Sequence, residues 1–221
     1  MIFNILLVMA FQFFGLASSD QPEFKGGSKN LNTFISNNLI YPEFSKENCI
    51  QGTVNISFKL NPQGKVYASE VQKGYGIDLD VEALRVVRLS SGKWIVPASH
   101  DTTTALILPV NFSLKGYQCE QLSKDQVGAA INAYHARMDL SKAIFNFYDK
   151  KSKGVYDQSD ENRIIALKMQ LGYNEKYIDR LLKQGQRKLK QGDSESACDD
   201  FLSVRQLGSD KANSLIEQNC K

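Results

Sequence analysis

The sequence lacks an excess of charge of either sign. Its 221 residues include 27 Lys and Arg residues against 24 Asp and Glu residues. A protein that binds nucleic acid through its phosphates needs a strongly positive surface, which this composition does not provide. The basic run RKLKQ at 187–191 is typical of a solvated helix face. Nucleic-acid binding is therefore not expected.

Histidine is scarce, and the residue patterns of common catalytic sites are missing. His135 precedes Asp139 by four residues, which is the spacing of a pair on a helix surface. The second histidine, His100, forms no recognisable nucleophile pattern with Asp101 or Ser113. The sequence contains no phosphate-binding loop and no metal motif, and it indicates no small-molecule substrate. We predict a protein that is not an enzyme, with no catalytic, cofactor-binding or metal-binding residue.

Charged side chains are absent from the N-terminal segment MIFNILLVMAFQFFGLASS. Its apolar run from Ile2 to Ala17 is shorter than the roughly 20 residues that a membrane span requires. The small residues Ala17, Ser18 and Ser19 then provide a signal-peptidase site, although no Lys or Arg precedes the apolar run. We expect residues 1–19 to be a cleaved signal peptide that delivers the chain to the periplasm. The alternative is an uncleaved inner-membrane anchor facing the periplasm, and only then is membrane association expected.

Export gives a meaning to the four cysteines. They show no C-x-x-C spacing and no histidine at a ligand spacing, so a zinc site is not expected. In an oxidising compartment, four cysteines form up to two disulfides, and three pairings are open. The cysteines are Cys49, Cys119, Cys198 and Cys220.

A strictly alternating run predicts a β-hairpin. In GTVNISFKL (52–60), every second residue is apolar, as in a strand with one buried face. The sequence Asn61-Pro62-Gln63-Gly64 has the residues of a type I turn, and KVYASEVQ (65–72) returns as the partner strand.

Further helix and strand patterns flank the hairpin. LNTFISNNLI (31–40) predicts a short amphipathic helix that ends before Pro42. Asp78 or Asp80 can cap a second helix, which ends at 90–92. TTTALILPVNFSL (102–114) predicts a third strand, and its apolar face is formed by Leu106, Leu108, Val110, Phe112 and Leu114.

The order helix, strand, strand, helix, strand limits the topology. A right-handed crossover from the second strand to the third must step over one neighbour, which gives the spatial order 2-1-3. The first and third strands are then antiparallel neighbours, so the start of the first lies near the end of the third. Cys49 and Cys119 flank these two ends. The topology therefore predicts a disulfide between them.

An ordered series of short motifs from about Pro22 to Leu114 resembles the C-terminal domain of TonB-type energy transducers. The motifs are Tyr41-Pro42, Gly52-x-Val54-x-Ile56-x-Phe58, Gly64-x-Val66, Glu82-Ala83-Leu84, Trp94, Pro97 and Pro109-Val110-x-Phe112. The resemblance implies an α/β periplasmic domain that docks on outer-membrane TonB-dependent transporters. Such a domain holds a short extended segment of the transporter on its last strand.

The resemblance also implies which residues contact the partner. The Tyr-Pro segment lies near the docking surface in this family, and the open edge of the third strand accepts the guest strand. The implied partner-binding residues are Tyr41, Pro42, Thr104, Leu106, Leu108 and Val110. Pro109 favours an edge position for this strand, but it removes one N–H from the ladder with the guest. A protected edge without a ligand is the alternative.

The chain departs from a complete transducer in one respect. Energy transducers of this family have an uncleaved inner-membrane helix and a long proline-rich spacer. This sequence has five prolines, and none are clustered. We therefore expect binding of a partner, whereas energy transduction by this chain alone is not expected.

Helical periodicity dominates the rest of the chain. It occurs in DQVGAAINAYHARMDLSKAIFNFYDKK (125–151) and again over 160–189. The end of the chain (189–221) predicts a helix–turn–helix capped by Asp193 or Ser194, and it resembles one tetratricopeptide- or Sel1-like hairpin. Cys198 and Cys220 lie at opposite ends of this unit, and antiparallel helices bring such ends together. A second disulfide is predicted there.

Together these patterns predict an α+β protein. Residues 1–19 form the signal, residues 20–115 form the TonB-like domain with a three-stranded antiparallel sheet and two helices, and residues 116–221 form an all-helical domain. The predicted function is an exported protein-binding module for outer-membrane transporters or other periplasmic proteins, with a role in energy-coupled transport as a further implication. The alternative is a periplasmic structural or adaptor protein whose helical half recognises partners.

Overall fold

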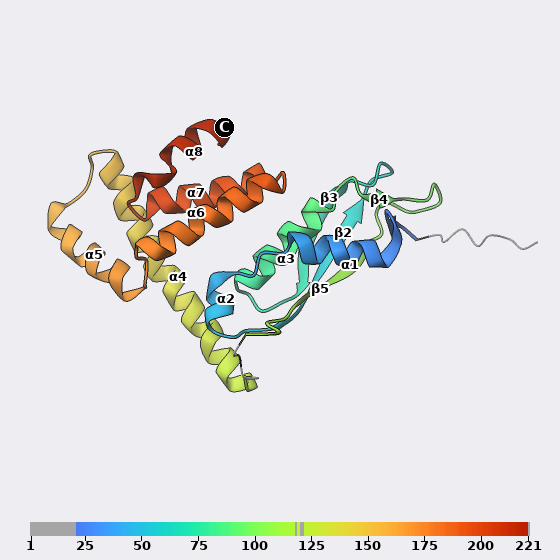
Figure 1. Cartoon of the computed structure of the whole chain (residues 1–221), viewed down its shortest axis with the longest axis horizontal. Coiled ribbons are helices and arrows are strands. Elements are labelled where there is room, and N and C mark those ends of the chain that lie inside the picture. Colours follow the sequence, from blue (N-terminus) through green and yellow to red (C-terminus); the bar gives the residue numbers. More distant parts are fainter. Residues whose placement is uncertain (1–20, 118, 120–121, 221) are drawn as a thin grey trace, which may run out of the picture.

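The computed structural model describes residues 21–117, 119 and 122–220. It consists of a sheet half (21–117) followed by a helical half (122–220), as Figure 1 shows. The predicted α+β class is confirmed. The elements are β1 (Glu23–Phe24), α1 (Gly27–Asn38), α2 (Glu43–Glu47), β2 (Gly52–Leu60), β3 (Val66–Lys73), α3 (Asp78–Leu89), β4 (Trp94–Ile95), β5 (Leu106–Phe112), α4 (Lys124–Ser152), the 3-10 turn η1 (Gln158–Asp160), α5 (Glu161–Gln170), α6 (Glu175–Lys190), α7 (Ser194–Gln206), the 3-10 turn η2 (Asp210–Ala212) and α8 (Asn213–Asn219).

The sheet has the order β3-β2-β5, and β2 is antiparallel to both neighbours. This is the order 2-1-3 that the connection rules predict. The Gly64 N–H donates to the Asn61 carbonyl oxygen at 2.9 Å, as in a type I turn. Gly64 has a φ of 74°, and a Cβ atom there would lie 2.2 Å from the Trp94 carbonyl oxygen. A glycine is therefore required at this turn.

The core of the sheet half contains the apolar face of β2. Its four alternating apolar residues are each at most 2% exposed: Val54, Ile56, Phe58 and Leu60. The Trp94 ring contacts Phe58 and Phe24 at centroid distances of 5.2 and 5.4 Å, and its Nε1–H donates to the Ser90 hydroxyl at 2.9 Å. A short second sheet, β1 with β4, brings Phe24 beside Trp94. Strands of two residues are too short to produce an alternating pattern, so this sheet was not predicted.

The predicted capping of α3 by Asp78 or Asp80 is wrong. Ile77 occupies the N-cap position, and no side chain caps the helix. The Asp80 carboxylate instead accepts the N–H groups of Tyr75 and Gly76, at 2.9 and 2.7 Å. Aspartate side chains bind nearby loop N–H groups as readily as helix N–H groups, and here the loop donors are the ones that are bound.

The helix pattern before the hairpin is also divided differently from the prediction. The helix α1 begins at Gly27, ends at Asn38 and is followed by the short helix α2, which was not predicted. Pro42 takes the N-cap position of α2, where its missing N–H costs no intrahelical bond.

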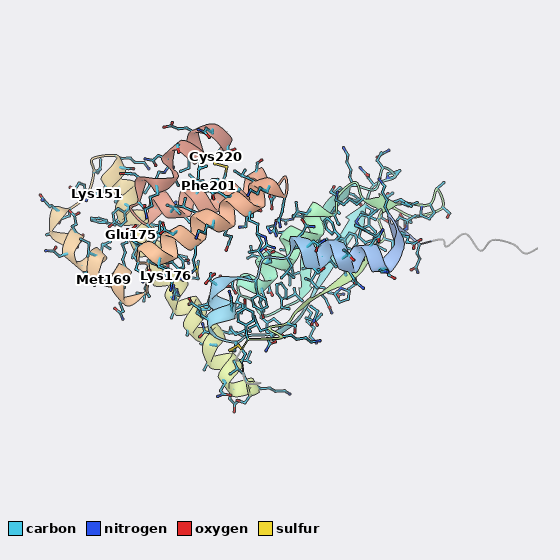
Figure 2. The ribbon with its side chains drawn as sticks, in the orientation of Figure 1. Lys151, Met169, Glu175, Lys176, Phe201 and Cys220 are labelled. Atoms are coloured by element: carbon cyan, nitrogen blue, oxygen red, sulfur yellow. A yellow bond between two sulfur atoms is a disulfide. The ribbon has the colours of Figure 1, made fainter. Side chains whose placement is uncertain are left out.

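The helical half has one core of its own, to which residues from α4 to α8 contribute. The pattern over 160–189 is interrupted at Gly172, which has a φ of 71° and separates α5 from α6. Asp193 caps α7 as predicted, because its carboxylate accepts the Ser196 N–H at 3.1 Å. A Cβ atom at Gly185 would lie 2.5 Å from the ring of Phe201, so α6 and α7 pack closely at this point (Figure 2). The resemblance to a tetratricopeptide or Sel1-like unit stays a prediction.

Both predicted disulfides are present. Cys49 is bonded to Cys119 and Cys198 to Cys220, with Cα–Cα distances of 5.5 and 5.6 Å. The first links the loop before β2 to the segment that leads into α4, and the second joins α7 to the end of α8.

The expected signal segment, residues 1–19, lies outside the described residues. In the part of the chain that the structure describes, no helix has both the length and the hydropathy of a membrane-spanning segment.

Candidate functional site at the edge of the sheet

β5 forms one edge of the three-stranded sheet. Among the described strands it pairs only with β2, from Gly52 opposite Phe112 to Phe58 opposite Leu106. Leu108 and Val110, two of the predicted site residues, are buried, whereas Ile107 is 45% exposed. Leu106, Leu108 and Val110 therefore lie together on the edge strand, but their side chains face the core.

The main-chain groups of β5 alternate between the two sides of the strand. A proline is tolerated in a strand where its nitrogen points away from the neighbouring strand, so Pro109 places the odd-numbered residues outward. The Leu114 N–H, two residues beyond β5, donates to Gln51 Oε1 at 2.7 Å on the β2 side, which agrees with even-numbered residues pointing inward. We infer that the open edge offers the N–H groups of Ile107 and Asn111. The carbonyl groups of all three odd-numbered residues, including Pro109, face the same way.

Thr104, another predicted site residue, precedes β5 and lies in a turn. The expected strand over 102–114 is shorter, because Asp101 stabilises this turn. The Asp101 carboxylate accepts the N–H and the hydroxyl of Thr103 at 2.9 and 2.7 Å, and these bonds lower the pKa of Asp101. The Thr104 N–H donates to the Asp101 carbonyl oxygen at 3.0 Å.

Tyr41 attaches the Tyr-Pro segment to the end of β5. Its hydroxyl donates to the Ile50 carbonyl oxygen at 2.6 Å, and its ring meets Phe112 edge to face at 5.6 Å. Burial, together with the nearby charge of Asp78, raises the pKa of Tyr41 to about 12, so the hydroxyl remains a donor at neutral pH. Tyr41 is thus brought close to the edge strand, while Pro42 begins α2 and faces the helical half.

The helical half docks on the segment between α1 and α2. Carbonyl groups at the end of a helix have no intrahelical partner. Here the Asn38 oxygen accepts Gln191 Nε2–H at 3.1 Å, and the Leu39 oxygen accepts Arg187 Nη2–H at 3.2 Å. Arg180 of α6 forms ion pairs with two glutamates of α2 at 3.1 and 3.2 Å. The Tyr-Pro segment is therefore held from both sides, by β5 and by α6.

Arg85 joins the two halves through a buried network. It is 5% exposed, and its guanidinium donates to Glu82 of the same helix at 2.7 Å. It also donates to the Asn38 carbonyl oxygen, to Gln191 Oε1 and to Asp193 Oδ2, at 2.7, 2.9 and 3.2 Å. A buried charge needs such partners, because burial without them is strongly unfavourable.

Sequence reasoning missed both this network and the outward groups of β5. Glu82 belongs to one of the family motifs, and its carboxylate accepts the Ile40 N–H at 2.6 Å. Glu82 precedes Arg85 by three residues, and this spacing indicates an ion pair on one face of a helix. The outward role of Ile107 and Asn111 also followed from the position of Pro109, but the alternation was used only for side chains.

A match to a protein-family model supports the resemblance of the sheet half to TonB C-terminal domains. Residues 37–114 match the family model described as Gram-negative bacterial TonB protein C-terminal. A solution structure of the Helicobacter pylori TonB C-terminal domain is similar, with 27% sequence identity over 40% of this chain and 95% of that one, and a TM-score of 0.34. No curated protein matches the chain. The family match ends before α4, so it does not include the helical half.

Proposed function

We propose that residues 37–114, which belong to the TonB C-terminal domain family, bind an extended segment of a partner protein by strand addition on β5. The observation that carries this proposal is the one-sided pairing of β5, which bonds to β2 and to no other described strand. Strand addition uses main-chain groups, so it makes little demand on the guest sequence.

The proposed partner is an outer-membrane TonB-dependent transporter or another periplasmic protein. The family supports this assignment, and the two disulfides fit an oxidising compartment. A role in energy-coupled transport is proposed on the same family ground. N-terminal sequencing of the mature protein tests the location: a first residue near Asp20 is expected, and an intact Met1 would contradict a cleaved signal.

The proposal can be tested through the few N–H donors that the open edge of β5 offers. A guest strand beside β5 meets two outward N–H groups, those of Ile107 and Asn111, separated by the proline. Replacing Ile107 by proline removes one of the two and adds a ring that faces the guest. We expect Ile107→Pro to weaken capture of a transporter-derived extended peptide by at least about tenfold, measured by titration calorimetry.

Ile107→Ala is the matched control, because it shortens the same exposed side chain and keeps the N–H. Its capture of the peptide should stay within about threefold of the wild type, a difference of less than 1 kcal/mol. Equal affinities for Ile107→Pro and the wild type would show that the guest does not pair with β5.

A second candidate function is recognition of partners by the helical half. It is favoured by apolar side chains that are exposed on α5 and on the loop that follows α4: Met169 at 76%, Ile165 at 43% and Val155 at 71%. Figure 2 shows Met169 on the side of the helical half that faces away from the sheet half. Met169→Glu should abolish partner binding if this surface recognises the partner. If the partner instead binds by strand addition, Met169→Glu should leave capture by β5 unchanged.

A further inference from the structure

A cavity of about 190 Å³ lies where the two halves meet, separate from the edge of β5. Its walls come from α2, from the start of α3, from α4, and from α6 with the turn that precedes it. The lining residues that matter here are Glu43, Phe44, Tyr134, Arg137, Tyr177 and Arg180. The cavity therefore exists only while the helical half is docked on the Tyr-Pro segment.

Aromatic rings form much of the lining. Phe44 and Tyr134 contact each other edge to face at 5.0 Å, across the boundary between the halves. Tyr173 and Tyr177 form a second pair at 4.9 Å. An apolar cavity of about 150 Å³ is large enough to bind benzene, so this cavity has room for one ring with a short polar arm.

The two arginines of the lining differ in their partners. Arg180 forms ion pairs with Glu43 and Glu47, so its charge is compensated. Arg137 forms no ion pair with any residue between 21 and 220 that the structure describes. It lies over the Tyr173 ring at 4.8 Å, and only its Nε donates a hydrogen bond, a long one of 3.4 Å to the Tyr173 hydroxyl. Its Nη groups thus remain available as charged donors beside the cavity.

Two tyrosine hydroxyls add further donors. Those of Tyr134 and Tyr177 form no hydrogen bond within the described part of the chain. Burial is the largest cause that raises the pKa of Tyr134 to about 12, and it raises the pKa of Tyr177 as well. Both hydroxyls therefore keep their protons at neutral pH and can donate to an anion.

The carboxylates of the lining are already engaged by protein groups. Glu43 and Glu47 pair with Arg180, and Asp78 accepts the hydroxyl and the N–H of Ser45. The groups left without a strong partner are the donors, headed by the Arg137 guanidinium. The chemistry that matches them is an anion with planar oxygens, for which arginine provides a fork of parallel donors.

We propose that this cavity binds a carboxylate carried on an aromatic or similarly planar apolar group. The carboxylate accepts hydrogen bonds from Arg137 and the tyrosine hydroxyls, and the apolar group lies among the four rings. A free aromatic acid and the C-terminus of a peptide that ends in phenylalanine both present this chemistry.

The test titrates the full-length, disulfide-bonded protein with 3-phenylpropanoate and follows binding by NMR. Saturable binding is expected, with shifts at residues that line the cavity. Arg137→Gln should weaken binding by at least about tenfold, because it removes a charge-assisted hydrogen bond. The matched control is Arg205→Gln, which makes the same change at an exposed position of α7 and should leave binding unchanged.

Three further comparisons complete the experiment. The neutral amide 3-phenylpropanamide should bind at least about tenfold more weakly than the acid. The peptide Gly-Gly-Phe, with a free or an amidated C-terminus, separates a peptide end from a free aromatic acid as the ligand. Tighter binding of the free-terminus peptide than of 3-phenylpropanoate assigns the site to a chain end. Tighter binding of 3-phenylpropanoate assigns the site to a small acid. Arg137→Lys keeps the charge and should bind with intermediate affinity, which keeps the proposal testable should Arg137→Gln fail to fold.

Absence of saturable binding by both acid and peptide would overturn the proposal, and so would unchanged binding in Arg137→Gln. The outcome is independent of strand addition, because Ile107→Pro alters only the edge of β5 and should bind 3-phenylpropanoate as the wild type does.

Discussion

The sheet half and the helical half offer different chemical groups to a partner. In the helices, main-chain N–H and C=O groups are bonded within the same segment, so the helical half presents side chains. Among the strands that the structure describes, β5 pairs with β2 alone, so the sheet half presents main-chain groups along its edge. Main-chain recognition tolerates many guest sequences, whereas side-chain recognition selects few. Under the proposed function, extended segments of many sequences are therefore captured by the sheet half.

The halves also differ in how they bury charge. The helical half pairs Lys188 with Asp200 at 2.8 Å, inside its own core. The sheet half pairs Arg85 with Glu82 but completes the arginine's hydrogen bonds with Asp193 and Gln191 of the other half. The stability of the sheet half should therefore depend on the helical half more than the reverse.

The largest expected effect comes from removing Arg85. Arg85→Ala leaves the buried Glu82 carboxylate without its cation, and such changes cost about 3–5 kcal/mol of unfolding free energy. Arg180→Ala removes a partly exposed pair at the same boundary and should cost about 1 kcal/mol or less. Urea denaturation of both variants measures the difference. Similar losses in the two variants would mean that the buried Arg85 network contributes no more to stability than the partly exposed Arg180 pair.

The two disulfides close loops of different length. Cys49–Cys119 spans 70 residues and Cys198–Cys220 spans 22. From the entropy of closing such loops, replacing the first pair by serine should cost about 4 kcal/mol and replacing the second about 3 kcal/mol. Denaturation of the two double variants checks the order. A larger loss for Cys198–Cys220 would contradict it.

Asp200 gives the helical half a pH dependence of its own. Burial raises the pKa of its carboxyl to about 6, against the opposing charge of Lys188. Between its unfolded pKa near 4 and this value, the folded protein binds more protons than the unfolded protein, so stability falls as the pH rises. The expected loss from pH 4 to pH 6.5 is about 2 kcal/mol.

Comparison of the wild type with Asp200→Asn isolates this contribution. The difference in unfolding free energy between the two proteins should change over that pH range and stay constant above pH 7. A constant difference throughout would show that burial does not raise the pKa of Asp200.

Much of the sheet half could be predicted from the sequence. Alternation at Val54, Ile56 and Phe58 predicted β2 to the residue, and the connection rules then gave the strand order and the Cys49–Cys119 disulfide. These inferences rest on local periodicity and on chain topology, both of which a single sequence contains. The edge position of β5 followed from the same rules.

The junction of the halves could not be predicted in this way. Arg85 and Asp193 are 108 positions apart, and no periodic pattern connects two polar residues at that distance. The cavity beside Arg137 depends on the same docking, so it was equally hidden. Asp78 and Asp80 were misassigned because the sequence does not show which N–H groups compete for an aspartate.

Amide hydrogen exchange along β5 tests the central claim most directly. In the free protein, the Ile107 and Asn111 N–H groups should exchange rapidly, while those of Leu108 and Val110, bonded to β2, should be protected. Adding a transporter-derived extended peptide should slow exchange at Ile107 and Asn111 alone. Protection of these two amides in the free protein, or no change on adding peptide, would contradict strand addition on β5.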